Sequence, residues 1–280
     1  MSKNIFFIRG FSVNGIRRLE DLVNFHPKVN CRGDFSFEGL GKYLNEFFDS
    51  KRSVIIYERN ANLFKNSILK TMKDMMYNLC GKEFTRIGAS SADSIVPLYV
   101  PGSKYLVVYQ DMTDSVLSFL IYNLELGKNN IKLIDPGLVK LKGFQVMLKR
   151  HIEEPFDIQG VIDFLLVHPN LNKLWQKQWY LRFMKDYRMS SKPFVDTLWV
   201  NYSDLFTEYE EVMSQVFEFL GLANTKKIVY HETLSSGYYD YPHTTLLSDK
   251  SVLETDIRDD ALELHAQIEQ ILVRPQRLVT

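Results

Sequence analysis

Two glycines near the start of the chain have the spacing of a phosphate-binding loop. Gly10 and Gly15 bracket the sequence GFSVNG, which follows the apolar run IFFI and precedes a segment with helical periodicity. A nucleotide P-loop has the same G-x-x-x-x-G spacing but continues with lysine and then serine or threonine. Ile16 and Arg17 stand at those two positions here, so the motif does not support hydrolysis of a nucleoside triphosphate.

The backbone of this loop could still hold an anion. We expect the N–H groups of Gly15, Ile16 and Arg17 to point into the loop, at the positive end of a helix dipole. Arg17 and Arg18 are expected in the first helical turn, where a cation opposes the dipole unless an anion is bound. The alternative is that both arginines face solvent and pair with acidic side chains of the same helix.

Strand and helix patterns alternate along the chain and place the loop between a strand and a helix. Compact apolar runs typical of buried strands stand at 4–11 and 104–109. Further strands are expected at 82–90 and 197–202, and 53–58 could be a strand or the start of the helix that follows. Amphipathic segments separate them, and helices are predicted to stop at Gly127 and Gly221. This alternation predicts an α/β fold with a parallel sheet flanked by helices. We expect one domain over 1–280, with a helix-rich section at about 130–195.

Other residue types that carry chemistry show no ligand spacing. His26 precedes a proline at a predicted helix end, where a capping role is expected. The other histidines form no HxxxH pair, and Cys31 and Cys80 form no CxxC pair, so no metal site is predicted. Core packing is expected, with the lining of an acceptor pocket as the alternative, for Trp175, Trp179, Tyr180 and Phe183.

Charge and composition argue against several classes of partner. The 34 Lys and Arg residues balance 34 Asp and Glu residues, so no global basic field favours nucleic acid or an anionic membrane. No run approaches the roughly 18 apolar residues of a membrane span, and the N-terminal apolar run ends at Arg9. We therefore expect a soluble, cytoplasmic protein, and the sequence leaves its oligomeric state open.

Several blocks of the sequence, taken in order, resemble bacterial sulfotransferases. The family opens with a strand, a Gly-Phe-x-Arg/Lys-Ser-Gly-Thr loop, a helix, an HP pair and a Gly-Glu-Phe-like segment. The corresponding blocks here are FFIRGFSVNGIRRLEDLVNFHP, GDF, IGASSADSIVPLYVPGSKYLVVYQDMTDSVLSF and LWVNYSDLFTEYEEVMSQVFEFLGL. Together they span residues 5 to about 222.

The resemblance implies a P-loop-like α/β fold and a sulfuryl donor, 3′-phosphoadenosine 5′-phosphosulfate (PAPS). It also implies transfer to a hydroxyl or amine of a small-molecule or carbohydrate acceptor, by positioning and charge stabilisation. Asp34 stands where the family has an acidic general base, and Arg17 is a candidate cation for the reacting group. Donor binding is expected from Gly10, Phe11, Ser12, Asn14, Gly15, Ile16, Arg17, Arg18, Gln110 and Ser118.

The charged side chains of the family's donor site are replaced in this sequence. The loop cation aligns with Val13, the serine after it with Asn14, and the arginine for the 3′-phosphate with Gln110. By analogy with an oxyanion-hole donor, one such group is worth about 3–4 kcal/mol in the transition state. Substitute cations could come from the middle section or from Arg9, Arg17 or Arg18. Two hypotheses follow: a divergent sulfotransferase, or a catalytically inactive descendant acting as a binding or structural subunit.

Overall fold

The computed structural model describes residues 5–10, 13–32, 84–91, 102–110, 112–153, 158–190 and 195–223, together with Lys70, Asp74 and Met76. In chain order, the described elements are β1 (Ile5–Gly10), α1 (Val13–Asn24), β2 (Val29–Arg32), β3 (Arg86–Ser91), β4 (Lys104–Tyr109), α4 (Met112–Asn129), η2 (Ile131–Leu133), α5 (Pro136–Val139), α6 (Lys142–Glu153), α7 (Ile158–Val167), α8 (Pro169–Ser190), β5 (Asp196–Asn201), α9 (Asp204–Thr207) and α10 (Tyr209–Phe219).

The chain divides into two compact units. The first comprises Met1–Tyr109 and Phe183–His231, and the second comprises Gln110–Arg182 and Glu232–Thr280. Helix α8 runs through the boundary, so its last two turns belong to the first unit. Whether the two units form the single domain expected over 1–280 stays a prediction.

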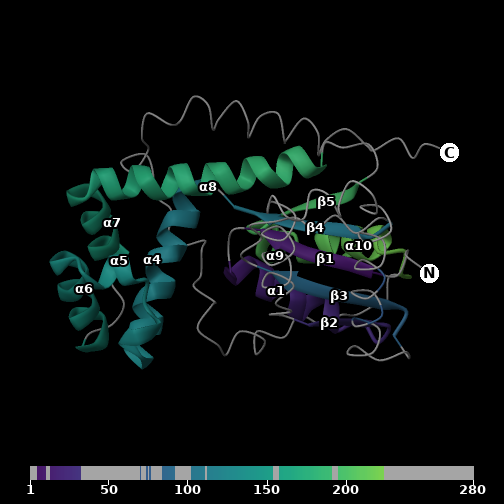
Figure 1. Cartoon of the computed structure of the whole chain (residues 1–280). Helices are drawn as coiled ribbons and strands as arrows, with labels where there is room; N and C mark the ends of the chain where they lie inside the picture. Colours follow the sequence, from purple (N-terminus) through teal and green to yellow (C-terminus); the bar gives the residue numbers. More distant parts are fainter. Residues whose placement is uncertain are drawn as a thin grey trace, which may run out of the picture. The chain divides into compact units, whose positions relative to one another are not determined.

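The first unit is built on a parallel sheet. Figure 1 shows its five described strands side by side in the order β2-β3-β1-β4-β5. Every neighbouring pair is parallel, which confirms the predicted α/β fold and puts all carboxyl ends at one edge. Strand β2 is not predicted by the sequence pattern, because it is only four residues long and two of them, Asn30 and Arg32, are polar.

The connections after β1 and β4 leave in opposite directions. The chain runs from β1 through α1 to β2 at one edge of the sheet, and from β4 to β5 at the other edge. Ligands of open α/β sheets bind outside the carboxyl ends of the strands where the connections diverge in this way. The loop after Gly10 therefore lies where the topology favours a ligand.

Strand register decides which helix covers which side of the sheet. Arg9 pairs with Val107, and Val107 with Trp199, so their side chains share one face. Gly10 pairs with Val108 on the opposite face. Helix α1 packs on the Val108 face with the apolar residues that were predicted to share one side of it, all of them buried: Ile16, Leu19, Leu22 and Val23.

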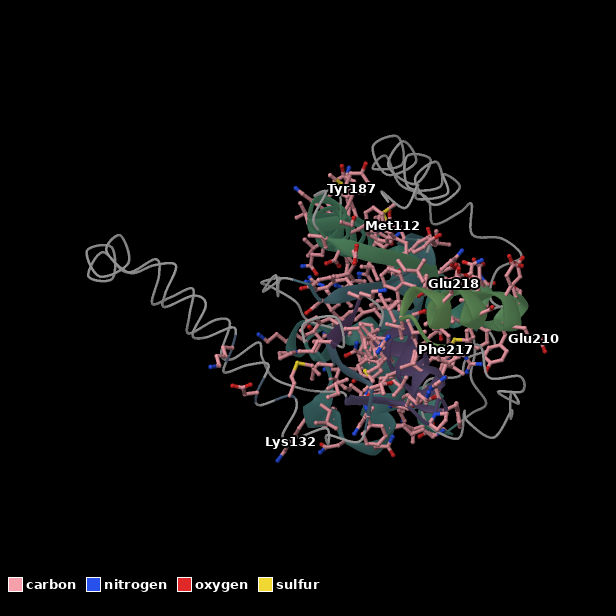
Figure 2. All side chains as sticks on the ribbon, turned by 90° about the vertical axis from the view of Figure 1, so that its right-hand side faces the viewer. Met112, Lys132, Tyr187, Glu210, Phe217 and Glu218 are labelled. Carbon is pink, nitrogen blue, oxygen red and sulfur yellow. The ribbon has the colours of Figure 1, made fainter. Side chains whose placement is uncertain are left out.

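The end of α10 lies at the amino ends of β3 and β4, opposite the carboxyl ends of the strands. Gly221, at φ +68°, donates to the Glu218 carbonyl, and the Leu222 N–H donates to the Phe217 carbonyl, forming a Schellman motif. This confirms the predicted helix stop at Gly221. Figure 2 shows Phe217 among the interior side chains and Glu210 at the rim, in agreement with their burial.

Cations from the sheet hold the final carbonyls of α10. Arg86 donates to the Leu220 carbonyl and, at 3.0 Å, to that of Gly221, while Lys104 donates to Phe219. Positive charge is favourable at a helix C-terminus, where carbonyls lack partners within the helix. Partial burial lowers the pKa of the Arg86 guanidinium from its ordinary value.

The described part of the second unit, within 110–182, is helical, as predicted for the middle section. Its core joins α4, α5, α6 and α7, with Trp175 of α8 packed 5.2 Å from the Phe119 ring. Helix α4 does not stop at Gly127 but continues to Asn129. Gly127 is buried, and a Cβ there would come within 2.5 Å of Ile134, so this glycine serves helix packing rather than a helix end.

Candidate functional site

Gly10 ends β1 in a backbone conformation that other residues rarely adopt. Its φ is +155°, and a Cβ added there would collide with the carbonyl oxygen of Val108 on the neighbouring strand. Glycine is the residue that such a conformation and such close backbone packing favour. The packing of β1 against β4 therefore favours glycine at position 10.

Helix α1 begins earlier than predicted. It starts at Val13, with two residues between it and the end of β1 at Gly10. Arg17 and Arg18 therefore lie in its second turn rather than in its first. By position, the amides at the helix N-terminus are thus those of Val13, Asn14 and Gly15, so the expectation is wrong for Ile16 and Arg17. Phe11 and Ser12 lie outside the described residues, and for Asn14 only the backbone is described.

Gly15 has a packing role in this helix. A Cβ at this position would lie 2.7 Å from the Val108 side chain and 2.9 Å from the Tyr202 ring. Contacts below 3.0 Å require neighbouring atoms to move, so Gly15 lets α1 approach β4 and the end of β5 closely. The sequence pattern predicted that Gly15 allows a phosphate to approach the backbone closely. The structure gives a second reason for glycine at this position, which is helix packing and needs no ligand.

Arg9 points away from the loop and is held by an acidic partner. Strand alternation puts its side chain on the face opposite Val108 and α1. There its guanidinium lies 2.6 Å from the Asp186 carboxylate of α8, and the two side chains are only 6% and 8% exposed. Phe183 packs beside this pair on the Trp199 ring at 5.3 Å. Arg9 is therefore engaged elsewhere and is poorly placed to replace the loop cation.

The two arginines of α1 have different environments. Arg18 is buried, with its guanidinium carbon 4.0 Å from the centre of the Phe206 ring, a cation–π arrangement. The prediction that both arginines face solvent is wrong for Arg18, because α9 brings an aromatic ring over it. Arg17 is exposed. Among these arginines, Arg17 has the side chain with access to a ligand in solution.

Gln110 and Ser118 belong to the second unit. Both are buried, and the Gln110 amide donates to the Ser118 hydroxyl at 3.4 Å. Asp114, between them in sequence, is buried in the first turn of α4, where the helix dipole favours an acidic group. Asp34 and Asp111 lie outside the described residues.

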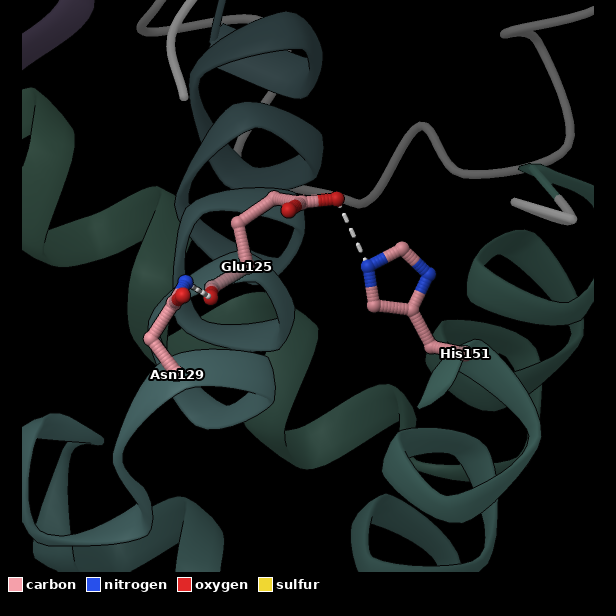
Figure 3. A network of polar contacts seen from close by, with 3 residues as sticks. All are labelled: Glu125, Asn129 and His151. Atoms are coloured by element: carbon pink, nitrogen blue, oxygen red, sulfur yellow. Dashed lines mark hydrogen bonds and ion pairs between the residues drawn. The ribbon is translucent and has the colours of Figure 1, made fainter. Parts of the chain in front are cut away.

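The histidines of the described chain have structural partners. His26 lies 3.3 Å from the Ala223 carbonyl and accepts from the Lys28 N–H at 3.1 Å, so its side chain joins the segments after α1 and α10, and its capping of α1 stays a prediction. Figure 3 shows His151 of α6 against Glu125 of α4, with His151 Nε2 2.7 Å from Glu125 Oε1. Within the described ranges, no three His, Cys, Asp or Glu side chains gather as metal ligands.

The chain is similar to several solved sulfotransferase structures. A mouse sulfotransferase complexed with PAP matches at 9% identity and TM-score 0.44, covering 98% of this chain and 85% of its own. The sulfotransferase domain from the curacin biosynthetic pathway matches at 14% identity and TM-score 0.43, covering 95% of this chain and 97% of that domain. The sulfotransferase domain from the Synechococcus PCC 7002 olefin synthase matches at 13% identity and TM-score 0.41, covering 95% of this chain and 94% of that domain.

These likenesses assign no role to any residue of this chain, because every TM-score lies below 0.5. No family model and no curated protein sequence matches the chain. In the part of the chain that the structure describes, no helix is both long and apolar enough to cross a membrane.

The sequence did not point to two residues that decide how the groups near the loop are engaged, Asp186 and Tyr202. Asp186 stands in a helix far along the chain from Arg9, and its position in a polar stretch of α8 resembles that of a solvated side chain. Tyr202 follows β5 and shapes the space beside Gly15. Neither contact has a local pattern from which it could be found.

Proposed function

We propose that this protein transfers a sulfuryl group from PAPS to a hydroxyl or amine of a small-molecule or carbohydrate acceptor. The observation that carries the proposal is the end of β1 at Gly10, whose positive φ precedes the N-terminus of α1 at Val13. Gly10 lies at the carboxyl ends of β1 and β4, where the connections diverge. A helix N-terminus in this place is suited to an anionic group such as a 5′-phosphosulfate.

Sulfuryl transfer requires the protein mainly to position donor and acceptor and to stabilise the charge that develops on the leaving oxygen. The acceptor oxygen or nitrogen bonds to sulfur while the bond from sulfur to the phosphate oxygen breaks, and adenosine 3′,5′-bisphosphate leaves. The N-terminal amides of α1 would hold the phosphosulfate, and the exposed Arg17 would balance charge on the leaving oxygen. Asp34 is proposed to take the acceptor's proton, and Gln110 with Ser118 to contact the 3′ end of the nucleotide.

A binding measurement tests the proposal. Calorimetric titration of the full chain with adenosine 3′,5′-bisphosphate is expected to show one site per chain. Arg17→Gln should weaken that site about tenfold or more, whereas Arg150→Gln, an exposed arginine on α6, should leave it unchanged. Absence of binding at millimolar nucleotide would overturn the proposal.

The second function, a binding or structural subunit without turnover, is favoured by the arginines. Arg9 is committed to Asp186 and Arg18 to Phe206, so both are engaged away from a donor. A protein of this kind would bind the nucleotide but transfer no sulfuryl group from labelled PAPS to a panel of hydroxyl and amine acceptors. Transfer at a rate that Arg17→Gln reduces would exclude it.

A further inference from the structure

Helix α8 has a buried face and, opposite to it, an exposed face that carries leucines. Its inner face is buried at intervals of four and three residues, through Asn172, Gln176 and Trp179 in the second unit. On the other side, Leu174 and Leu181 are 49% and 51% exposed. They are seven residues apart, or two helical turns, and so lie on one line along the helix.

The outer leucines are accompanied by positive charge. Lys173 and Lys177 are exposed on the same side of α8, next to Leu174 and between the two leucines. A pair of leucines at heptad spacing with flanking lysines is the pattern of a helix that receives a second, acidic helix. We call this surface, formed by Lys173, Leu174, Lys177 and Leu181, the outer face of α8.

A segment of the same chain has the complementary pattern. Residues 258–272, RDDALELHAQIEQIL, have helical periodicity in the sequence and lie outside the described residues. Four of their apolar residues follow a heptad rhythm: Ala261, Leu264, Ile268 and Ile271. Between 259 and 272 there are four acidic residues and no lysine or arginine: Asp259, Asp260, Glu263 and Glu269.

We infer that residues 259–272 form a helix that docks on the outer face of α8. Leu264 and Ile271 have the same seven-residue spacing as Leu174 and Leu181, so both pairs can meet along one seam. The acidic residues then flank Lys173 and Lys177, which gives the contact its charge complementarity. A tethered segment reaches its site at an effective concentration in the millimolar range, which favours this occupant over a second copy of the chain. The inference does not depend on the proposed function.

Hydrogen exchange of the full chain, followed by mass spectrometry, tests the contact. In the wild-type protein, the amides of 259–272 should exchange at least tenfold more slowly than in the isolated peptide. Leu174→Lys with Leu181→Lys should return them to the peptide rate, while the amides of β1 and β4 stay protected. Val146→Lys with Ile152→Lys changes two exposed apolar residues of α6 and is the matched control, expected to leave the segment protected.

Charge reversal gives a second and independent test. Lys173→Glu with Lys177→Glu should reduce protection of 259–272, and adding Asp260→Lys with Glu263→Lys should restore it. Exchange at the peptide rate in the wild type, or protection that the leucine variants do not alter, would overturn the inference. Protection that rises with protein concentration would also overturn it, because the segment would then be contacting a second chain.

Discussion

The buried ion pair between Arg9 and Asp186 makes the sharpest prediction of this structure. Its charged atoms are 2.6 Å apart, and both side chains are almost completely buried. Two unit charges at about 4 Å attract by about 4 kcal/mol at an effective dielectric constant of about 20. Removing one partner from such a pair leaves a buried, uncompensated charge and typically costs about 3–5 kcal/mol.

We therefore expect Asp186→Ala to lower the free energy of unfolding by about 3–5 kcal/mol. For a chain of 280 residues, the unfolding entropy is about 0.6 kcal/mol per kelvin, so a loss of about 4 kcal/mol lowers Tm by roughly 7 °C. Arg9→Met should lose a similar amount. The double variant Arg9→Met with Asp186→Ala should lose far less than the sum of the two single losses, because no charge remains buried.

Urea denaturation of the four proteins, followed by tryptophan fluorescence, measures this cycle. Trp199 makes the signal sensitive to the region, since its ring contacts Phe183 on the same helix as Asp186. Lys149→Ala with Glu153→Ala removes an exposed pair at 4.0 Å and is the control, expected to change stability by less than about 1 kcal/mol. A loss below about 1 kcal/mol for Asp186→Ala, or strictly additive losses in the double variant, would refute the reasoning.

The remaining predictions concern packing, a helix end and the second unit. Gly15→Ala should destabilise by about 1–3 kcal/mol in urea denaturation, because the added methyl overlaps two side chains; unchanged stability would contradict the packing role. Arg86→Met should cost about 1–3 kcal/mol and speed hydrogen exchange at the end of α10, since it leaves the Leu220 carbonyl without its charged donor. His151→Phe should cost about 1–3 kcal/mol by thermal unfolding through loss of its bond to Glu125, and a stabilised variant would show that this bond contributes nothing.

Local features of the fold could be read from the sequence because their causes are local. The apolar run before Gly10 predicts β1, and the apolar spacing from Ile16 to Val23 predicts the buried side of α1. The glycine at 221 predicts the end of α10, because a left-handed residue closes a helix wherever that helix lies. Strand and helix alternation likewise predicted the parallel sheet, since parallel neighbours need crossover connections.

The candidate site could be predicted only in outline. The sequence located the loop between Gly10 and Gly15, but it placed the helix start and the free amides too late. Helix boundaries depend on which backbone groups the rest of the protein leaves without partners, and local pattern fixes them only to within a few residues. Asp34 and the side chain of Asn14 stay predictions.

What the sequence by itself determined is the alternation of strands and helices, without β2, and the place of the loop between β1 and α1. The tertiary structure alone decided what the residues around the loop do. Alternation says that Arg9 and Gly10 point to opposite faces, but only the packing of α1 on one face and α8 on the other turns Arg9 toward Asp186. Gly15 and Gly127 have packing roles because of neighbours distant in the chain, and such contacts leave no periodic trace in the sequence.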